Sequence, residues 1–202
     1  MLSRDRSDMY YKGEKMESPV FPNTDFHGYG RAIRKELRNR IATRRKLRVL
    51  DVGTGLGQNM TFLLRHLSNN SEIWTIDPSE EVLAGARASL GKKASRVNFV
   101  QASAERLDFA DGFFDMVVSV MVLHHVEDAQ VVLTELARVL KKGGRLLLVD
   151  YSPEAANRLE FHTRHEKRDF FESKIVGATL RRLGLACSEA DFGIWYLIDA
   201  HK

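Results

Sequence analysis

Cysteine is almost absent from this chain of 202 residues, and so are long apolar runs. Cys187 is the single cysteine, which excludes a disulfide framework and a cluster of thiolate metal ligands. No apolar run approaches the roughly 20 residues that a membrane-spanning helix needs. The charged first residues lack the apolar stretch of a secretion signal. We therefore expect a cytoplasmic protein with no membrane span.

The length and composition suit one domain of ordinary size. With 202 residues, of which 44% are hydrophobic, the chain can bury a substantial core. Residues 1–30 contain the chain breakers Pro19, Pro22 and Gly28. We expect them to form an N-terminal arm or lid, in which Tyr10 and Tyr11 could cover a ligand or pack on the sheet. Residues 31–202 are expected to form the single domain.

Short apolar segments alternate with amphipathic ones along the chain. A helix is predicted around Ile33, Leu37 and Ile41, which recur every four residues. Further helices are expected at residues 58–67, from Pro78 onward, at 128–140 with a stop at Gly143 and Gly144, and at 154–169 and 170–183. Strands are expected at residues 47–51, 73–76, 97–100, 114–121, 145–150, 185–192 and 194–200. This alternation predicts an α/β fold with a mostly parallel sheet and helices on both faces.

The first predicted strand ends in a glycine-rich loop, Asp51-Val52-Gly53-Thr54-Gly55-Leu56-Gly57. Glycine lets a backbone turn sharply and approach a ligand closely. A dinucleotide loop would need glycine at its sixth position, where this chain has Gln58. The spacing therefore favours a ligand without pyrophosphate and disfavours a nicotinamide oxidoreductase.

Asp77 follows the second predicted strand, about 20 residues after the loop, where an acid can bind both ribose hydroxyls. The alternative is that Asp77 caps the helix beginning at Pro78. Both roles are compatible with the sequence.

Residues 49–57 resemble the first motif of class I S-adenosylmethionine-dependent methyltransferases. Residues 100–109 and 113–118 resemble the adenine-side segment of the ubiquinone/menaquinone-biosynthesis-like (methyltransferase type 11) branch, and residues 123–126 and 138–146 complete its order. The resemblance implies a Rossmann-like seven-stranded sheet with strand order 3-2-1-4-5-7-6, strand seven antiparallel. It also implies S-adenosylmethionine as the cofactor.

The resemblance assigns roles to individual residues. Asp51 would bind the ammonium group of the methionine part of the cofactor, and Asp77 would bind the ribose. Ser119 would pack against the methionine part. Ser103 stands where the family usually has Asp, so Glu105 is the alternative partner for adenine. The cofactor-binding residues implied are Asp51, Gly53, Thr54, Gly55, Asp77, Pro78, Ser103, Ala104, Glu105, Ser119 and Val120.

The methyl group of a sulfonium is already activated, so the protein chiefly positions the acceptor. A base is needed only for a protonated acceptor. His124 is the candidate base, beside His125, and the alternative is a structural histidine bonded to backbone. His162 and His165 are three residues apart without a third ligand nearby, so we expect no metal site.

We expect methyl transfer to an unidentified acceptor, with a small molecule favoured. A protein or RNA methyltransferase with an open site, or a non-catalytic module that binds the cofactor, are the alternatives.

Basic residues are concentrated near the start of the chain. Residues 1–48 hold 13 basic and six acidic residues, although the whole chain has a net charge of only +4. This asymmetry could attract nucleic acid, or it could merely solvate one face of the first helix. The second interpretation is favoured, so RNA should bind weakly and remain unmethylated. The basic residues concerned are Arg34, Lys35, Arg38, Arg44 and Arg45.

Overall fold

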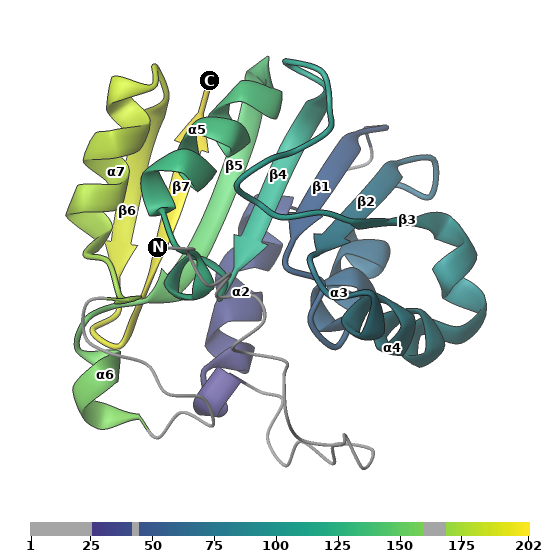
Figure 1. The fold of residues 1–202 in the computed structure, drawn as a ribbon, viewed down its shortest axis with the longest axis horizontal. Helices are drawn as coiled ribbons and strands as arrows, with labels where there is room; N and C mark the ends of the chain where they lie inside the picture. The colour runs from purple at the N-terminus through teal and green to yellow at the C-terminus, as the bar shows by residue number, and fades with distance from the viewer. Residues whose placement is uncertain (1–25, 42–44, 160–168) are drawn as a thin grey trace, which may run out of the picture.

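A seven-stranded sheet forms the middle layer of the computed structural model, which describes residues 26–41, 45–159 and 169–202 (Figure 1). Its order, β3-β2-β1-β4-β5-β7-β6, is the predicted one. β7 runs antiparallel to both of its neighbours, and the other pairs are parallel. The strands are β1 Arg48–Val52, β2 Glu72–Asp77, β3 Val97–Gln101, β4 Phe114–Val120, β5 Leu140–Tyr151, β6 Ala186–Asp191 and β7 Trp195–His201.

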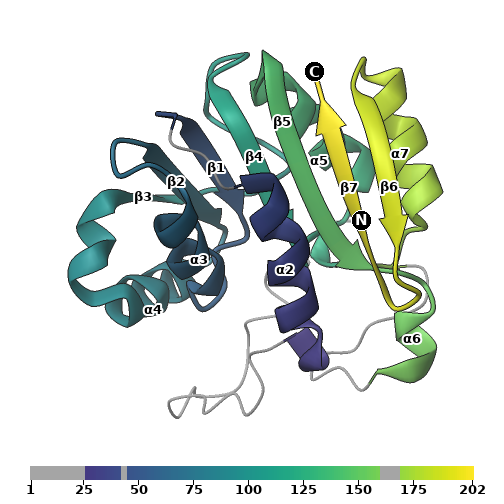
Figure 2. The same cartoon turned by 180° about the vertical axis from the view of Figure 1, so that it is seen from behind.

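Helices cover both faces of the sheet, as predicted. α5 and α7 lie on the face turned toward the viewer in Figure 1, and α2 and α3 lie on the face shown in Figure 2. The two faces bury separate hydrophobic clusters. The helical segments are η1 Phe26–Gly28, α2 Gly30–Ile41, α3 Gln58–His66, α4 Glu80–Leu90, η2 Gly91–Arg96, η3 Leu123–His125, α5 Ala129–Val139, α6 Ala155–Arg158 and α7 Ser173–Arg182.

The apolar stripe of α2 confirms the helix that the four-residue spacing predicted. Ile33, Leu37 and Ile41 are at most 2% exposed and belong to the core, whereas Arg31 and Lys35 on the same helix are exposed. Residues four apart lie on one face of a helix, so this spacing turns a strongly basic segment into a core helix. None of the helices described has the length and apolar character that crossing a bilayer demands.

The predicted start of α4 was wrong by two residues. The helix begins at Glu80, and its N-cap is Ser79, whose hydroxyl oxygen accepts a hydrogen bond from Val82 N at 3.2 Å. Asp77 stays in β2, paired with Gln101 of β3. Asp77 therefore does not cap the helix, although its carboxylate accepts a hydrogen bond from Ser79 N at 3.1 Å.

The predicted stop of α5 at Gly143 and Gly144 was also wrong. The chain becomes extended at Leu140, and β5 begins there and continues through both glycines. The β4–β5 register shifts between the pairs of Phe114 and Met116, which accommodates this irregular start. Gly143 N also donates a hydrogen bond to Lys202 O at 2.7 Å, so strand-like contacts replace the helix cap.

Of the helix predicted at residues 154–169, the structure describes residues 154–159 and Asp169. α6 is only four residues long, because the backbone is extended at Leu159. The later helix, α7, begins at Ser173 rather than at residue 170. Of the predicted arm or lid at residues 1–30, residues 1–25, with Tyr10 and Tyr11, lie outside the described residues, as do Arg44, His162 and His165.

Candidate functional site

The candidate site lies at the edge of the sheet where β1, β2, β4 and β5 reach their carboxyl ends, at the bottom of Figure 1. In open α/β sheets this edge is where ligands bind. The glycine loop after β1, Asp77 at the end of β2 and the loop after β4 meet there. Asp150 lies one residue before the end of β5.

The glycine loop is shaped by its own backbone and by a close neighbour. Gly53, Gly55 and Gly57 all have positive φ, at 81°, 48° and 78°. Other residues rarely adopt that conformation. A Cβ at Gly53 would also collide with the side chain of Val122, in the loop after β4. Glycine at position 53 thus brings the loops after β1 and β4 into contact.

Asp51 is fully buried just before this loop. One carboxylate oxygen, Oδ2, accepts a hydrogen bond from the Thr75 hydroxyl at 2.8 Å, and Thr75 in turn lies 2.7 Å from the Thr54 hydroxyl. The other oxygen, Oδ1, forms no hydrogen bond of normal geometry within the described residues, although the Asn59 side chain is close enough to lower the pKa of the carboxyl group. Burial raises the pKa of Asp51 to about 7. An unpaired buried acceptor of this kind suits a cationic group at the loop.

Asp77 holds the other side of the loop. Its carboxylate accepts hydrogen bonds from Gly55 N at 3.4 Å and from Ser79 N at 3.1 Å. Only 4% of the residue is exposed. Burial raises the pKa of Asp77, and the hydrogen bonds from backbone amides oppose that rise. Asp77 therefore links the glycine loop to the start of α4, next to the exposed Pro78.

The predicted adenine-side residues follow β3. Ser103 Oγ accepts a hydrogen bond from Glu105 N at 3.2 Å, and Ala104 is buried. The Glu105 carboxylate accepts hydrogen bonds from Glu127 N at 3.0 Å and Asp128 N at 3.4 Å. Glu105 thus joins this segment to the loop before α5. Its contact with adenine stays a prediction.

The end of β4 carries local backbone strain. Ser119 and Val120 are 2% and 5% exposed, on the strand beside β1. Met121 follows with φ +58°, in the left-handed region that costs a side chain energy. Its N–H donates a hydrogen bond to Val149 O at 2.8 Å. Such strain often occurs at functional sites, because the surrounding structure must hold it in place.

Asp150 is the one central residue that the sequence did not identify as part of the site. It is 1% exposed, and its Oδ2 accepts hydrogen bonds from Val122 N at 3.0 Å and Leu123 N at 2.6 Å. Its Oδ1 accepts hydrogen bonds from Tyr151 N at 2.7 Å and from His124 Nδ1 at 2.5 Å. The sequence feature that could have identified Asp150 is an acidic residue that follows four apolar residues at the end of a buried strand.

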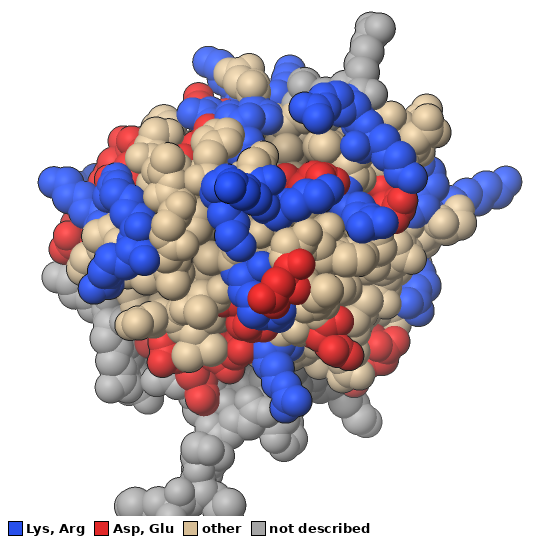
Figure 3. Space-filling view, turned by 90° about the horizontal axis from the view of Figure 1, so that it is seen from above, with Lys and Arg blue, Asp and Glu red and all other residues tan. Residues whose placement is uncertain are grey.

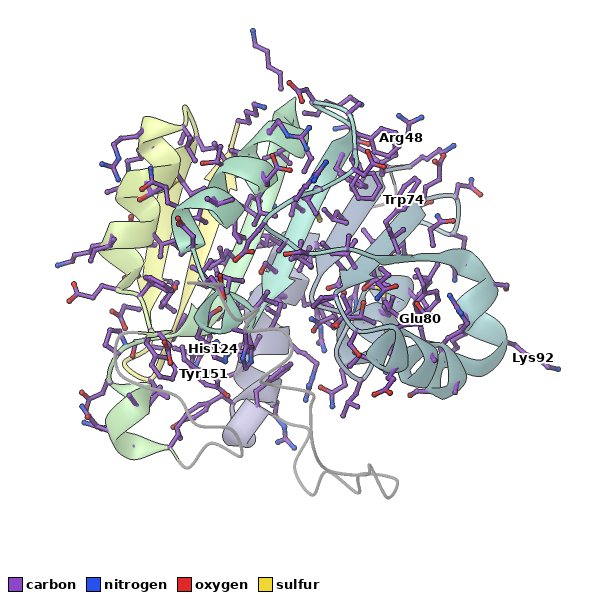
Figure 4. The ribbon with its side chains drawn as sticks, in the orientation of Figure 1. Arg48, Trp74, Glu80, Lys92, His124 and Tyr151 are labelled. Atoms are coloured by element: carbon purple, nitrogen blue, oxygen red, sulfur yellow. The ribbon has the colours of Figure 1, made fainter. Side chains whose placement is uncertain are left out.

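His124 and His125 differ in accessibility. His124 is 3% exposed, stacks on Phe170 with ring centroids 5.5 Å apart, and lies near Tyr151 (Figure 4). His125 is exposed, with its ring centroid 4.0 Å from that of His124. His124 is hydrogen-bonded to the carboxylate of Asp150, whereas the structural alternative predicted a hydrogen bond to the backbone. Its role as a base stays a prediction.

The described residues contain no group of three His, Cys, Asp or Glu side chains arranged to hold a metal ion. The polar groups of the site are instead single carboxylates, each held by backbone amides or hydroxyls. Such an arrangement can bind an ammonium group and a pair of hydroxyls at two ends of one ligand.

Comparison with known proteins gives consistent matches. The family described as "Methyltransferase domain" matches residues 50–148. The ubiquinone/menaquinone biosynthesis C-methyltransferase of Pectobacterium atrosepticum is 36% identical over 118 residues, which are 57% of this chain and 47% of that protein. O-methyltransferase rstn1 of Aspergillus nomiae is 33% identical over 118 residues, 58% of this chain and 52% of that protein.

Among solved structures, an S-adenosylmethionine-dependent methyltransferase from Mesorhizobium loti shares the fold. Its TM-score is 0.70 at 19% identity, with 89% of this chain and 100% of that chain covered. The chain spans about half the length of the curated relatives that it matches. Residues 50–148 therefore form a methyltransferase domain of the class I S-adenosylmethionine-dependent type, similar to the domain of the ubiquinone/menaquinone biosynthesis enzymes.

Proposed function

We propose that this protein transfers a methyl group from S-adenosylmethionine to a small-molecule acceptor. The observation that carries the proposal is the pair of buried carboxylates, Asp51 and Asp77, on either side of the glycine loop. Asp51 has an unpaired oxygen, and Asp77 is fixed by amides of the loop and of the start of α4. The ammonium and the ribose hydroxyls of the cofactor match these two groups.

The residues of the chain would position the cofactor rather than react with it. Asp51 would stabilise the ammonium, and Gly53 and Gly55 would allow close approach of the methionine arm. Asp77 would accept hydrogen bonds from the ribose hydroxyls. Ser119 and Val120 would support the methionine arm from the end of β4. When bound, the cofactor supplies a methyl group on a positively charged sulfur, which needs only a well-aligned nucleophile.

The adenine would lie on the segment after β3. Pro78 is exposed at the end of β2 and would pack beside the ring. Ser103, Ala104 and Glu105 would contact its edge, and Thr54 would stay below, bonded to Thr75. Because Glu105 also accepts hydrogen bonds from the loop before α5, adenine binding would be sensitive to that loop.

The acceptor is assigned to the small molecules on the basis of the relatives. One is named for ubiquinone and menaquinone biosynthesis and another as an O-methyltransferase. We assign Asp150 and His124 to positioning, because the buried carboxylate orders the loop after β4 through three donors of that loop. His125 is exposed beside this pair and is the histidine that an acceptor could reach.

Two measurements test the proposal. Calorimetry with S-adenosylhomocysteine should show saturable binding, and its absence at millimolar ligand in folded protein would contradict the cofactor assignment. Tritiated methyl transfer into a lysate, separated into small-molecule, protein and RNA fractions, should label the small molecules. Label in the RNA or protein fraction instead would show that the acceptor is RNA or protein and not a small molecule. Cofactor binding without label in any fraction would favour a non-catalytic binding module.

A further inference from the structure

A groove of about 340 Å³ lies between α2 and α3, on the face of the molecule shown in Figure 2. α2 contributes Arg34 and Arg38, which are one helical turn apart. α3 contributes polar residues along the facing side of the groove. None of the predicted cofactor-binding residues lines the groove. The α3 residues are Gln58, Thr61, Arg65 and His66.

The groove has an excess of positive charge. α3 contains no acidic residue, and Glu36, the only acid of α2, accepts hydrogen bonds from Arg40 at 2.8 Å instead. Arg38 and Arg65 are exposed, and within the described part of the chain neither forms an ion pair or a hydrogen bond. Their guanidinium groups are therefore available to an anion.

Several basic residues elsewhere on the described surface are paired with acidic side chains. Figure 3 shows the edge of the sheet opposite to the candidate cofactor site, where lysine and arginine side chains gather with acidic side chains among them. There Lys46 contacts Glu72 at 2.8 Å and Lys141 contacts Asp115 at 2.7 Å. That edge resembles an ordinary charged surface, in which opposite charges screen one another. Arg38 and Arg65 have no such ion pair among the described residues.

His66 is fixed in the groove by its neighbour one turn earlier. Its Nδ1 lies 2.8 Å from the carbonyl oxygen of Phe62, and the two rings are 4.2 Å apart. A carbonyl only accepts hydrogen bonds, so Nδ1 carries the proton and Nε2 remains for a ligand. Phe62 is 7% exposed and closes the base of the groove.

We propose that this groove binds the phosphate groups of a small phosphorylated molecule. Guanidinium groups match phosphate oxygens in geometry and charge. The volume lies within the range of small-molecule sites, about 300–1,000 Å³, rather than that of an extended nucleic-acid path. Because the lining excludes Asp51, Asp77 and the glycine loop, the site stands independently of the proposed methyl transfer.

Calorimetry with pyrophosphate tests the site, at constant ionic strength and in the full chain. We expect saturable binding with one ligand per chain. The double variant Arg38→Gln, Arg65→Gln should weaken it about tenfold or more, because two charge-assisted contacts are lost. The matched control is Lys92→Gln, Lys93→Gln, which removes the same charge from exposed residues of η2 far from the groove (Figure 4). The control should bind pyrophosphate like the wild type.

Three outcomes would overturn the assignment. Absence of saturable pyrophosphate binding would show that no phosphate site exists. Equal weakening in both double variants would reduce the effect to general surface charge. A single-stranded oligoribonucleotide that needs Arg38 and Arg65 but resists competition by pyrophosphate would assign the groove to nucleic acid. Binding of S-adenosylhomocysteine should be unchanged in all variants. Measuring it in parallel therefore separates this test from the test of the cofactor site.

Discussion

Replacing Asp51 with asparagine should remove a pH-dependent cost of folding. In the native state burial raises the pKa of Asp51 to about 7, whereas an unfolded aspartate has a pKa near 3.8. Between those values the native state holds a proton that the unfolded state has lost. The free energy of unfolding therefore falls as pH rises, by about 1.4 kcal/mol per pH unit from this one group.

The size of the effect follows from the two pKa values. Between pH 5 and pH 8 the wild type should lose about 2 to 3 kcal/mol through Asp51, and the loss is nearly complete about one pH unit above the native pKa. Asparagine cannot ionise, so Asp51→Asn should lack this part of the pH dependence. Titrating groups remote from Asp51 cancel in the difference, and the coupling to Asp77 is the last and smallest cause of the Asp51 shift. Urea unfolding at pH 5, 6, 7 and 8, followed by tryptophan fluorescence, measures the difference.

A stability difference between the two proteins that stays constant with pH would refute the reasoning. Cofactor binding gives an independent check on the same carboxyl group. An ammonium group near Asp51 favours the ionised form, so affinity for S-adenosylhomocysteine should rise from pH 6 to pH 7.5. 5′-Methylthioadenosine has the same nucleoside without the ammonium, and its affinity should stay flat. Asp51→Asn should remove the rise.

Three further predictions test other parts of the site. Asp77→Ala should weaken S-adenosylhomocysteine binding by about 1–3 kcal/mol, the cost of unmade hydrogen bonds to buried groups, and unchanged affinity in calorimetry would refute the ribose assignment. Gly53→Ala should destabilise the protein more than Gly55→Ala in thermal melts, because both have positive φ but only Gly53 faces Val122; equal losses would show that this contact is unimportant. Asp150→Asn should cost about 1.5–3 kcal/mol for each charge-assisted hydrogen bond lost, and an unchanged denaturant midpoint would contradict its role in ordering the loop.

The sequence predicted the architecture because period and spacing are local signals. The spacing of Ile33, Leu37 and Ile41 identified α2 in a segment dominated by arginine. The pattern failed where long-range contacts decide. Gly143 and Gly144 look like a helix stop, but contacts with Lys202, nearly 60 residues later, draw them into β5.

The candidate site shows the same division. The glycine loop and Asp77 are contiguous with strong motifs and could be recognised. Asp150 could not, because its importance comes from a loop 27 residues earlier in the chain, whose amides it binds. The burial that raises the pKa of Asp51 also depends on β2 and β4, which flank β1 in the sheet. Such properties arise from tertiary structure and have no local sequence pattern.

The position of β7 constrains the order in which the protein can fold during synthesis. β7 is the last strand in the chain but lies between β5 and β6, and it is the partner that links them. Until Trp195–His201 has left the ribosome, β5 has an open edge and β6 has no strand to pair with. β1 to β5 can assemble earlier, because their pairings need no later residue. The nascent chain therefore presents an unpaired strand edge, a site for unwanted association, until Trp195–His201 has emerged.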